Sequence, residues 1–468
     1  MRFAPLFALL GCTAASVVVP PVAVPLGREP EMRVLLHEGP ELTLRADTDV
    51  PLQVRGLPGG TRLLQRLELN LRGGGLEAEL DGKRRRLSAG SLLQVTSPDP
   101  RGIWLGQRRY RGELQISGRG GQLRVVNALG IETYLASVVG SEMPHAWPLA
   151  ALQAQAVAAR TYALQQRNRG GGWNVKASEA SQVYLGVEAE TPSTRQAVAT
   201  TRSLVLVHGG KLIDAVFHSS SGGVTEASGM VWRHQLPYLV SVPDHDQHSP
   251  MHRWQERFDP EGLRQRLPET GGIDAVEVLS RTTSGRVRHA RLRGPRGTLL
   301  LNGSELRRRL GLKSTLVDFE MVQATALLEP PPPLEAKPAS GLSRLERITA
   351  SIARSGRTAS WATSTGRAAY RGAPPGGSST AFVAPRPRLL GGLGQRQPVQ
   401  GLQLLVKGQG YGHGVGMSQW GAHGLAEQGA DFRTILRHYY RGAEVMPFQP
   451  YHDPALAQAG PWEPRWKG

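Results

Sequence analysis

Short alternating patterns of apolar and polar residues dominate the first quarter of the chain. Six segments between residues 32 and 118 place apolar side chains at alternate positions and end at Gly, Pro, Asp or Ser. They read MRVLLHEG, LTLRAD, PLQVRGLPGG, LLQRLELNLRGGG, SLLQVTS and YRGELQISG. A period of two, bounded by turn-forming residues, is typical of short strands in an antiparallel sheet. We therefore expect a β-rich N-terminal region over residues 32–118.

The apolar period changes to that of a helix after residue 119. Leu135, Val138 and Val139 follow an i, i+3, i+4 spacing, which predicts a helix over residues 132–143. Pro148 then opens a second, alanine-rich helix that runs to residue 167. One stripe of this helix carries Leu152, Ala156, Ala159 and Ala163. Small residues on the stripe allow a neighbouring element to approach closely.

Strand and turn patterns return in the second half of the chain. Residues 204–217 predict a hairpin around Gly209-Gly210, and residues 275–302 predict further strands. Residues 325–400 are rich in Pro, Gly, Ser and Arg and hold too little apolar surface to bury, so we expect a disordered insertion there. Asp431 is the expected N-cap of a final helix. These patterns predict an α+β fold.

The N-terminus has the pattern of an export signal. After Arg2 no charged residue occurs until Arg28, and the apolar run before Pro20 is shorter than the roughly 20 residues that cross a bilayer. We expect a cleaved secretory signal and an extracytoplasmic location in the periplasm or cell envelope. The sequence Leu9-Leu10-Gly11-Cys12 also resembles a bacterial lipobox. A lipid anchor on Cys12 is therefore a second interpretation of the same segment.

The net charge of the chain bears on which molecules it can bind. The chain has 56 Lys and Arg against 38 Asp and Glu, a net charge of +18 that favours an anionic partner. Nucleic acid is disfavoured because the sequence lacks interleaved base-stacking aromatics and a recognised binding fold. The single cysteine, Cys12, excludes an intramolecular disulfide and a cysteine-based zinc site in the body of the protein.

Glu142 is the carboxylate whose position points to acid chemistry. It follows Val139 by three residues and Leu135 by seven, so a continuing helix places it on the same apolar face. Desolvation on such a face raises the pKa of a carboxyl group, which can then hold a proton near neutrality and donate it. The alternative from spacing alone is a helix-terminal glutamate that points to water.

Several motifs around Glu142 resemble one protein family. The segment EMPHAWPLAALQAQAVAARTYAL, which starts at Glu142, is similar to the signature of the SpoIID/LytB family of bacterial cell-wall proteins, which includes the amidase enhancers. The match continues in SQVYLG, FHSSSGGVTEAS, PYLVSV and GQGYGHGVGMSQWGAHGLAEQGADFRTILRHYYRGAEV. It covers residues 110–325 and 401–445, with the low-complexity stretch between them.

This resemblance implies a lytic transglycosylase. Such enzymes cleave the MurNAc–GlcNAc bond of peptidoglycan in strands poor in stem peptides and leave 1,6-anhydro-MurNAc ends. Glu142 matches the family's catalytic acid, and one carboxyl group suffices because the 6-hydroxyl of the sugar attacks. No cofactor or metal is expected. The alternative is a non-catalytic glycan-binding module that enhances a separate N-acetylmuramoyl-L-alanine amidase. The expected partners are peptidoglycan glycan strands and, under the alternative, a cell-wall amidase.

The resemblance also sets the expected organisation and the substrate-binding candidates. The regions are a signal peptide or lipoprotein signal (1–27), the β-rich region (32–118), a SpoIID-like catalytic region with a substrate cleft (119–324), the insertion (325–400), the C-terminal part of the SpoIID-like region (401–445) and a tail (446–468). The substrate-binding candidates are Arg160, Tyr162, Gln182, Tyr184, His218, Ser219, Ser220, Ser221, His413 and Gln419. Arg160 has two interpretations, a contact with a muramyl lactyl carboxylate or an internal ion pair.

Three other patterns suggest a functional site, and each also has a simpler structural explanation. The glycines of 408–416 do not form a dinucleotide fingerprint, and we expect them to admit a sugar chain close to the backbone, or to pack a tight loop around His413. The serines after His218 lack a GxSxG elbow, which disfavours a serine hydrolase. The histidines and aspartate of 245–252 have metal-like spacing, but a polar loop explains them better. Some relatives bind zinc through Cys and His, and Ser181 in place of a cysteine argues against that site here.

Overall fold

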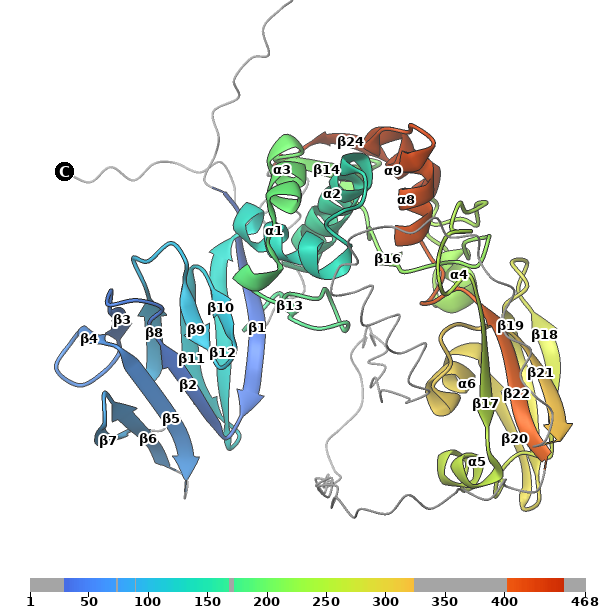
Figure 1. Ribbon diagram of the computed structural model, residues 1–468, viewed down its shortest axis with the longest axis horizontal. Coiled ribbons are helices and arrows are strands. Elements are labelled where there is room, and N and C mark those ends of the chain that lie inside the picture. Colours follow the sequence, from blue (N-terminus) through green and yellow to red (C-terminus); the bar gives the residue numbers. More distant parts are fainter. Residues whose placement is uncertain (1–28, 73–74, 89, 168–171, 324–401, 450–468) are drawn as a thin grey trace, which may run out of the picture.

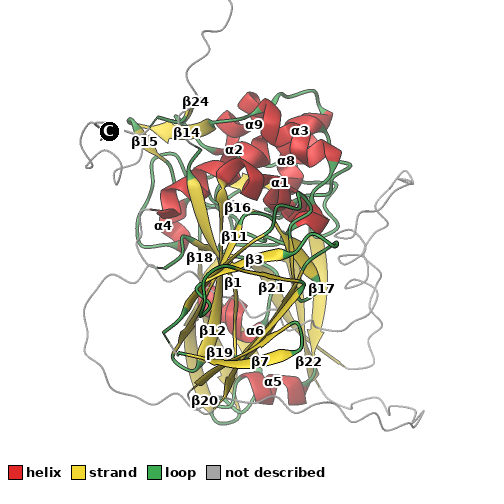
Figure 2. Ribbon diagram, turned by 90° about the vertical axis from the view of Figure 1, so that its left-hand side faces the viewer, coloured by secondary structure: helices red, strands yellow, loops and turns green. Residues whose placement is uncertain are grey.

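Two β-rich lobes flank a layer of helices (Figure 1). The computed structural model describes residues 29–449 except 73–74, 89, 168–171 and 324–401. The predicted signal, the lipobox at Cys12, the predicted insertion and most of the predicted tail lie outside the described residues. Most of the helices gather at one end of the molecule, and both lobes extend from them to the same side (Figure 2). The α+β fold class is confirmed.

The N-terminal lobe consists of two sheets that share one hydrophobic core. The first has the order β13 (Val175–Lys176), β1 (Glu31–Gly39), β12 (Gln122–Gly130), β11 (Glu113–Arg119), β8 (Leu92–Thr96), β3 (Leu52–Arg55), β4 (Arg62–Leu64). The second has the order β10 (Arg108–Tyr110), β9 (Ile103–Leu105), β2 (Glu41–Arg45), β5 (Arg66–Arg72), β6 (Gly75–Leu80), β7 (Lys83–Leu87). Only the β1–β13 pair of this lobe is parallel among the described strands. The alternating apolar residues face the shared core, as the period of two predicted.

The helical layer is built around α2. It contains α1 (Ile131–Glu142), α2 (Leu149–Gln166), α3 (Pro192–Thr200), the short 3-10 helix η2 (Val187–Ala189), α8 (Gln419–Glu427) and α9 (Phe432–Tyr439). Helices α1, α3, α8 and α9 all contact α2, and the alanines of α2 at 151, 154, 156, 158, 159 and 163 are fully buried. The predicted close approach is therefore confirmed, but it involves most of the helix circumference instead of one stripe.

A small three-stranded sheet packs against the helical layer, where β14 contacts α2. It has the order β15 (Lys211–Leu212), β14 (Leu204–His208), β24 (Glu444–Pro447). The predicted turn lies between β14 and β15, where Gly209 and Gly210 have φ values of 56° and 74°. Two successive left-handed residues make the hairpin turn that glycine favours. The second strand is shorter than predicted: the predicted hairpin extends to residue 217, and the strand ends at Leu212.

The second lobe has its own hydrophobic core. It contains the sheets β17 (Arg253–Phe258), β22 (Leu402–Gln409), β21 (Leu316–Gln323) and β18 (Ala275–Arg281), β19 (Val287–Gly294), β20 (Gly297–Asn302), with helices α5 (Pro260–Arg266) and α6 (Gly303–Leu310). Gln323 pairs with Leu402, so residues 324–401 connect the ends of neighbouring strands. The strands predicted over 275–302 are confirmed, but no sequence signal predicted a separate core for this lobe. No helix in the described part of the chain is long and apolar enough to cross a membrane.

The internal ion pair of Arg160 settles which of its two interpretations holds. Its side chain is 1% exposed and binds Glu132 of α1 through two hydrogen bonds of 2.6 and 3.0 Å. The guanidinium also donates to the Leu204 carbonyl at 3.1 Å, and Ser203 N donates to Glu132. Arg160 therefore joins α1, α2 and β14 inside the protein, and the expectation that it binds substrate is wrong.

Replacing Arg160 by Met should lower the free energy of unfolding by about 3–5 kcal/mol, because it leaves Glu132 buried without its cation. Chemical denaturation measures this loss. The matched control is Arg309→Met, which breaks a partly exposed ion pair with Glu269 and should cost about 1 kcal/mol or less. Equal losses for the two variants would contradict the structural role of Arg160.

Candidate functional site

Glu142 is the last residue of α1, and the next two residues explain why. Met143 has extended backbone angles of φ −129° and ψ 146°. It precedes Pro144, whose ring disfavours helical geometry in the preceding residue. The Met-Pro pair therefore ends the helix directly after Glu142. The carboxyl group lies at the edge of the buried face of α1, which carries Leu135, Val138 and Val139.

The Glu142 side chain is partly buried, and its carboxyl receives two hydrogen bonds. Val183 N donates to Oε1 at 2.7 Å, and Gln419 Nε2 donates to Oε2 at 3.3 Å. Burial raises the pKa of Glu142 to about 7, and the two donors oppose that rise. The nearby Glu179 carboxylate raises the pKa further. The group can therefore carry a proton near neutral pH and is also stabilised once it has lost it.

The segment 181–186 brings Val183 to Glu142, and its polar side chains hold it in place. Leu185 N donates to Ser141 Oγ at 3.3 Å. Gln182 bridges the Tyr134 hydroxyl at 2.9 Å and the Ala159 carbonyl at 3.2 Å, and Tyr184 donates to Asn127 at 2.9 Å. Gln182 and Tyr184 are at most 2% exposed. The expectation that they contact substrate is wrong, since both fix the loop that carries the Val183 donor.

Gln419 reaches Glu142 across 277 positions of sequence. A short parallel pair, β16 (Phe217–His218) with β23 (Met417–Ser418), places Gln419 at the start of α8. The Ser418 side chain caps α8 by accepting from Gly421 N at 3.1 Å. The site thus combines two candidate residues, Glu142 and Gln419, from distant segments of the chain.

The His218 to Ser221 segment is mostly buried. Ser221 and His218 Nε2 are 2.9 Å apart, and His218 Nδ1 lies 3.1 Å from the Val415 carbonyl. A serine beside a histidine resembles a nucleophile with its base, but His218, Ser220 and Ser221 are at most 4% exposed, which leaves no access for a substrate. The expected substrate contacts of these three residues are wrong. Ser219 is partly exposed and stays a candidate.

Asp246 explains the metal-like spacing of the polar segment near residue 245. Its carboxylate accepts from Ser220 Oγ at 2.5 Å, from Gly222 N at 2.7 Å and from Gly223 N at 2.9 Å, and it pairs with His252 at 3.1 Å. Burial opposes ionisation, but these donors hold the pKa of Asp246 at about 2. The carboxylate therefore orders the serine-rich turn. The described residues contain no group of three metal-ligating side chains.

The glycine-rich loop packs against protein. A side chain at Gly410, where φ is 73°, would meet the backbone of Ser221, and one at Gly414, where φ is 81°, would meet the buried Arg286. These glycines therefore admit the protein's own atoms, which corrects the expectation that they admit a sugar. His413 supports the same loop, because its Nδ1 accepts from Val415 N at 3.1 Å.

No distinctive sequence signal marked Trp232, Glu179, Arg307 or Tyr411. The ring of Trp232, 37% exposed, lies 5.4 Å from that of His413. Glu179, Arg307 and Tyr411 interact electrostatically with one another, and Glu179 also acts on Glu142. Burial, followed by the charge of Arg307, lowers the pKa of His413 to about 4, so its imidazole is neutral near pH 7. Tyr162 is partly exposed on α2 and stays a candidate.

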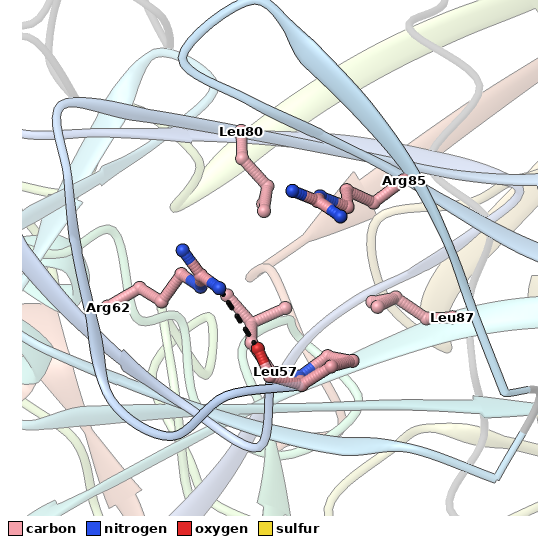
Figure 3. A pocket seen from close by; sticks show the side chains of 6 residues that line it. Leu57, Arg62, Leu80, Arg85 and Leu87 are labelled. Atoms are coloured by element: carbon pink, nitrogen blue, oxygen red, sulfur yellow. Dashed lines mark hydrogen bonds between the residues drawn. The ribbon is translucent and has the colours of Figure 1, made fainter.

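A small pocket in the N-terminal lobe contains none of these residues. Figure 3 shows Leu57, Arg62, Leu80, Arg85 and Leu87 around it, and Arg62 donates to the Pro58 carbonyl at 3.2 Å. Its lining is aliphatic apart from the two arginines. The lining of this pocket includes no acid or nucleophile.

Comparisons with known proteins point to one family. Residues 119–208, which include Glu142, match the family model of SpoIID, the stage II sporulation protein. The amidase enhancer of Bacillus subtilis is 29% identical over 323 residues, which cover 67% of this chain and 40% of that protein. Stage II sporulation protein D of Bacillus amyloliquefaciens is 28% identical over 341 residues, which cover 68% of this chain and 75% of that protein. The B. subtilis protein of that name is 26% identical with the same coverage.

The burial of Glu142 predicts a pH-dependent stability. An unfolded glutamate ionises near 4.5 and the folded one near 7, so stability contributed by the protonated group is full below 4.5 and lost as pH rises through 7. Glu142→Gln cannot ionise, and its stability relative to the native protein should rise by up to about 3 kcal/mol between pH 4 and pH 8. Urea denaturation across this range measures the difference. Glu179→Gln, at an exposed position, is the control, and equal pH dependence in both variants would contradict the burial of Glu142.

Proposed function

This chain belongs to the SpoIID family, and we propose that it is a peptidoglycan lytic transglycosylase. It would cleave MurNAc–GlcNAc bonds in strands poor in stem peptides and leave 1,6-anhydro-MurNAc ends. The family match and the relatives' names support a cell-wall-related role. The observation that carries the reaction is the Glu142 carboxyl, with its pKa of about 7 and two donors fixed on its oxygens. Peptidoglycan lies outside the cytoplasm, so the proposal includes export by the N-terminal segment.

The first step uses the protonated form of Glu142. Its proton passes to the glycosidic oxygen as the bond from this oxygen to C1 of MurNAc breaks, and the GlcNAc hydroxyl leaves neutral. The ionised carboxylate is then stabilised by Val183 N and the Gln419 amide, which supports proton transfer without a cation. A pKa near the working pH gives a useful population of the acid and a useful strength of the base.

The second step returns the proton. The Glu142 carboxylate accepts it from the 6-hydroxyl of MurNAc while that oxygen forms a bond to C1. The product is the 1,6-anhydro ring, and the enzyme regains its starting protonation state without consuming water. This sequence needs one residue that acts as acid and then as base, which fits a single enclosed carboxyl group.

A second candidate function is enhancement of a separate amidase. One relative carries the name amidase enhancer, although the alignment covers 40% of its length. Under this alternative the same groups would hold a glycan strand, and a cell-wall N-acetylmuramoyl-L-alanine amidase would be the partner. The two functions differ in whether purified protein alone changes the glycan.

Replacing Glu142 by Gln should lower the rate of glycan cleavage by about 10²- to 10⁴-fold, because the amide keeps the size of the side chain but has no proton to transfer. The assay incubates each protein with stem-peptide-free glycan strands and identifies 1,6-anhydro ends by mass spectrometry. Affinity for the strand should change little, since the Gln side chain occupies the same space.

The matched control is Glu179→Gln, which removes the neighbouring carboxylate. It should still cleave, and the alkaline limb of its pH profile should move to lower pH, because Glu179 raises the pKa of Glu142. Native activity in Glu142→Gln would contradict the assignment of the acid. A native protein that leaves strands intact yet accelerates an added amidase would favour the enhancer function.

A further inference from the structure

Three consecutive arginines on α6 have three different environments. The helix starts with a capping box between Asn302 and Glu305 and packs Leu306 and Leu310 into the core of the second lobe. Arg308 is exposed to solvent, and Arg309 pairs with Glu269 at 2.7 Å. Arg307 is partly buried. The three therefore form a natural comparison set on one helix.

The turn after α6 joins the second lobe to the glycine-rich loop. Arg307 Nε donates to the Leu312 carbonyl at 3.1 Å, which fixes the guanidinium against this turn. The next carbonyl, that of Lys313, accepts from Gly412 N at 3.0 Å, and Ser314 Oγ donates to the Gln409 carbonyl at 2.5 Å. These bonds hold the turn that Arg307 contacts against Gly412, and Arg307 acts electrostatically on the two neighbours of Gly412, Tyr411 and His413.

The charge of Arg307 is not compensated at short range. Within the described part of the chain, no carboxylate forms an ion pair with it, and its terminal nitrogens have no hydrogen-bond partner. Burial lowers the pKa of this guanidinium. The charges of Tyr411 and Glu179 act in the opposite direction and raise that pKa. An enclosed cation without a partner is costly, and proteins usually pair or bind it.

Three other cations in the described part of the chain are already engaged. Arg160 binds Glu132, and Arg286 donates to the Ser221 carbonyl at 2.7 Å and to the Val224 carbonyl at 3.1 Å. Lys313 lies 3.4 Å from Glu256 and above the Trp254 ring. The turn that Arg307 contacts is linked to the acid through packed residues: Gly412, bonded to Lys313, lies against His218. His218 pairs with Ser418, the residue before the Gln419 donor to Glu142.

Building on the proposed function, we infer that Arg307 binds the lactyl carboxylate of a MurNAc residue and so selects strands without stem peptides. In a bare strand this carboxylate is free and negatively charged, and two guanidinium nitrogens can bind its two oxygens together. In a peptide-bearing strand the same carboxyl is an amide without charge. Arg307 then lacks its partner, and binding loses the charged pair.

The test measures binding to two forms of one glycan. Muramyl oligosaccharides with free lactyl carboxylates are compared with the same oligosaccharides converted to methyl amides. Calorimetry uses full-length Glu142→Gln, so that cleavage does not interfere. The free carboxylate form should bind about tenfold or more tightly at low salt. Adding Arg307→Gln should remove this preference, adding Arg308→Gln should keep it, and adding Arg307→Lys should keep part of it.

The outcomes separate this inference from the proposed function. A preference that persists in the Arg307→Gln background would overturn the inference even if the native enzyme cleaves glycan. A preference that depends on Arg307 would support the inference even if the native protein proves to be a non-cleaving binder. Failure to bind either oligosaccharide would overturn both. Far-ultraviolet circular dichroism and thermal unfolding confirm that each variant is folded, and the Lys variant keeps the test valid if the Gln variant is not.

Discussion

The partial burial of one carboxyl group, that of Glu142, sets the requirements for the rest of the site. Glu142 would ionise near 4.5 in an unfolded chain, and enclosure at the end of α1 moves its pKa to about 7. Full desolvation without donors would keep the group permanently protonated, and full solvation would keep it ionised at neutral pH. The Val183 amide and the Gln419 side chain hold it between these limits. A single group can then donate a proton and accept one back.

Much of the surrounding structure serves to keep these donors in place. The buried pair of Arg160 and Glu132 joins α1 to α2, and Gln182 fastens the Val183 loop to both helices. On the other side, the serine-rich turn held by Asp246 and the glycine-rich loop filled by Arg286 support the strand pair that leads to Gln419. The polar side chains of these segments thus act mainly as internal supports, and the groups left open to the site are few.

Local features were predictable from the sequence, and long-range ones were not. The helix that ends at Glu142, the Gly209-Gly210 turn and the Asp431 cap depend on neighbouring residues, and all three were predicted correctly. Motif resemblance named both Glu142 and Gln419 as site residues, but it did not predict the contact between them across 277 positions of sequence. It could not show which polar side chains face inward, so Gln182, Tyr184 and Ser221 were misassigned. The burial of Arg160 and the open charge of Arg307 depend on which carboxylates the fold brings near each guanidinium, and spacing carries no such information.

Titration of the Glu142 carboxyl shows directly whether this group can act as the proton donor near neutral pH. Carbon-13 NMR of protein labelled at glutamate side chains follows each carboxyl through its pH transition, and the Glu142→Gln spectrum identifies the missing resonance. If burial raises the pKa as described, the midpoint of the Glu142 transition should be about 7. A midpoint near the ordinary value of 4.5 would mean that the group is solvated and ionised at neutral pH, and would contradict its role as the proton donor.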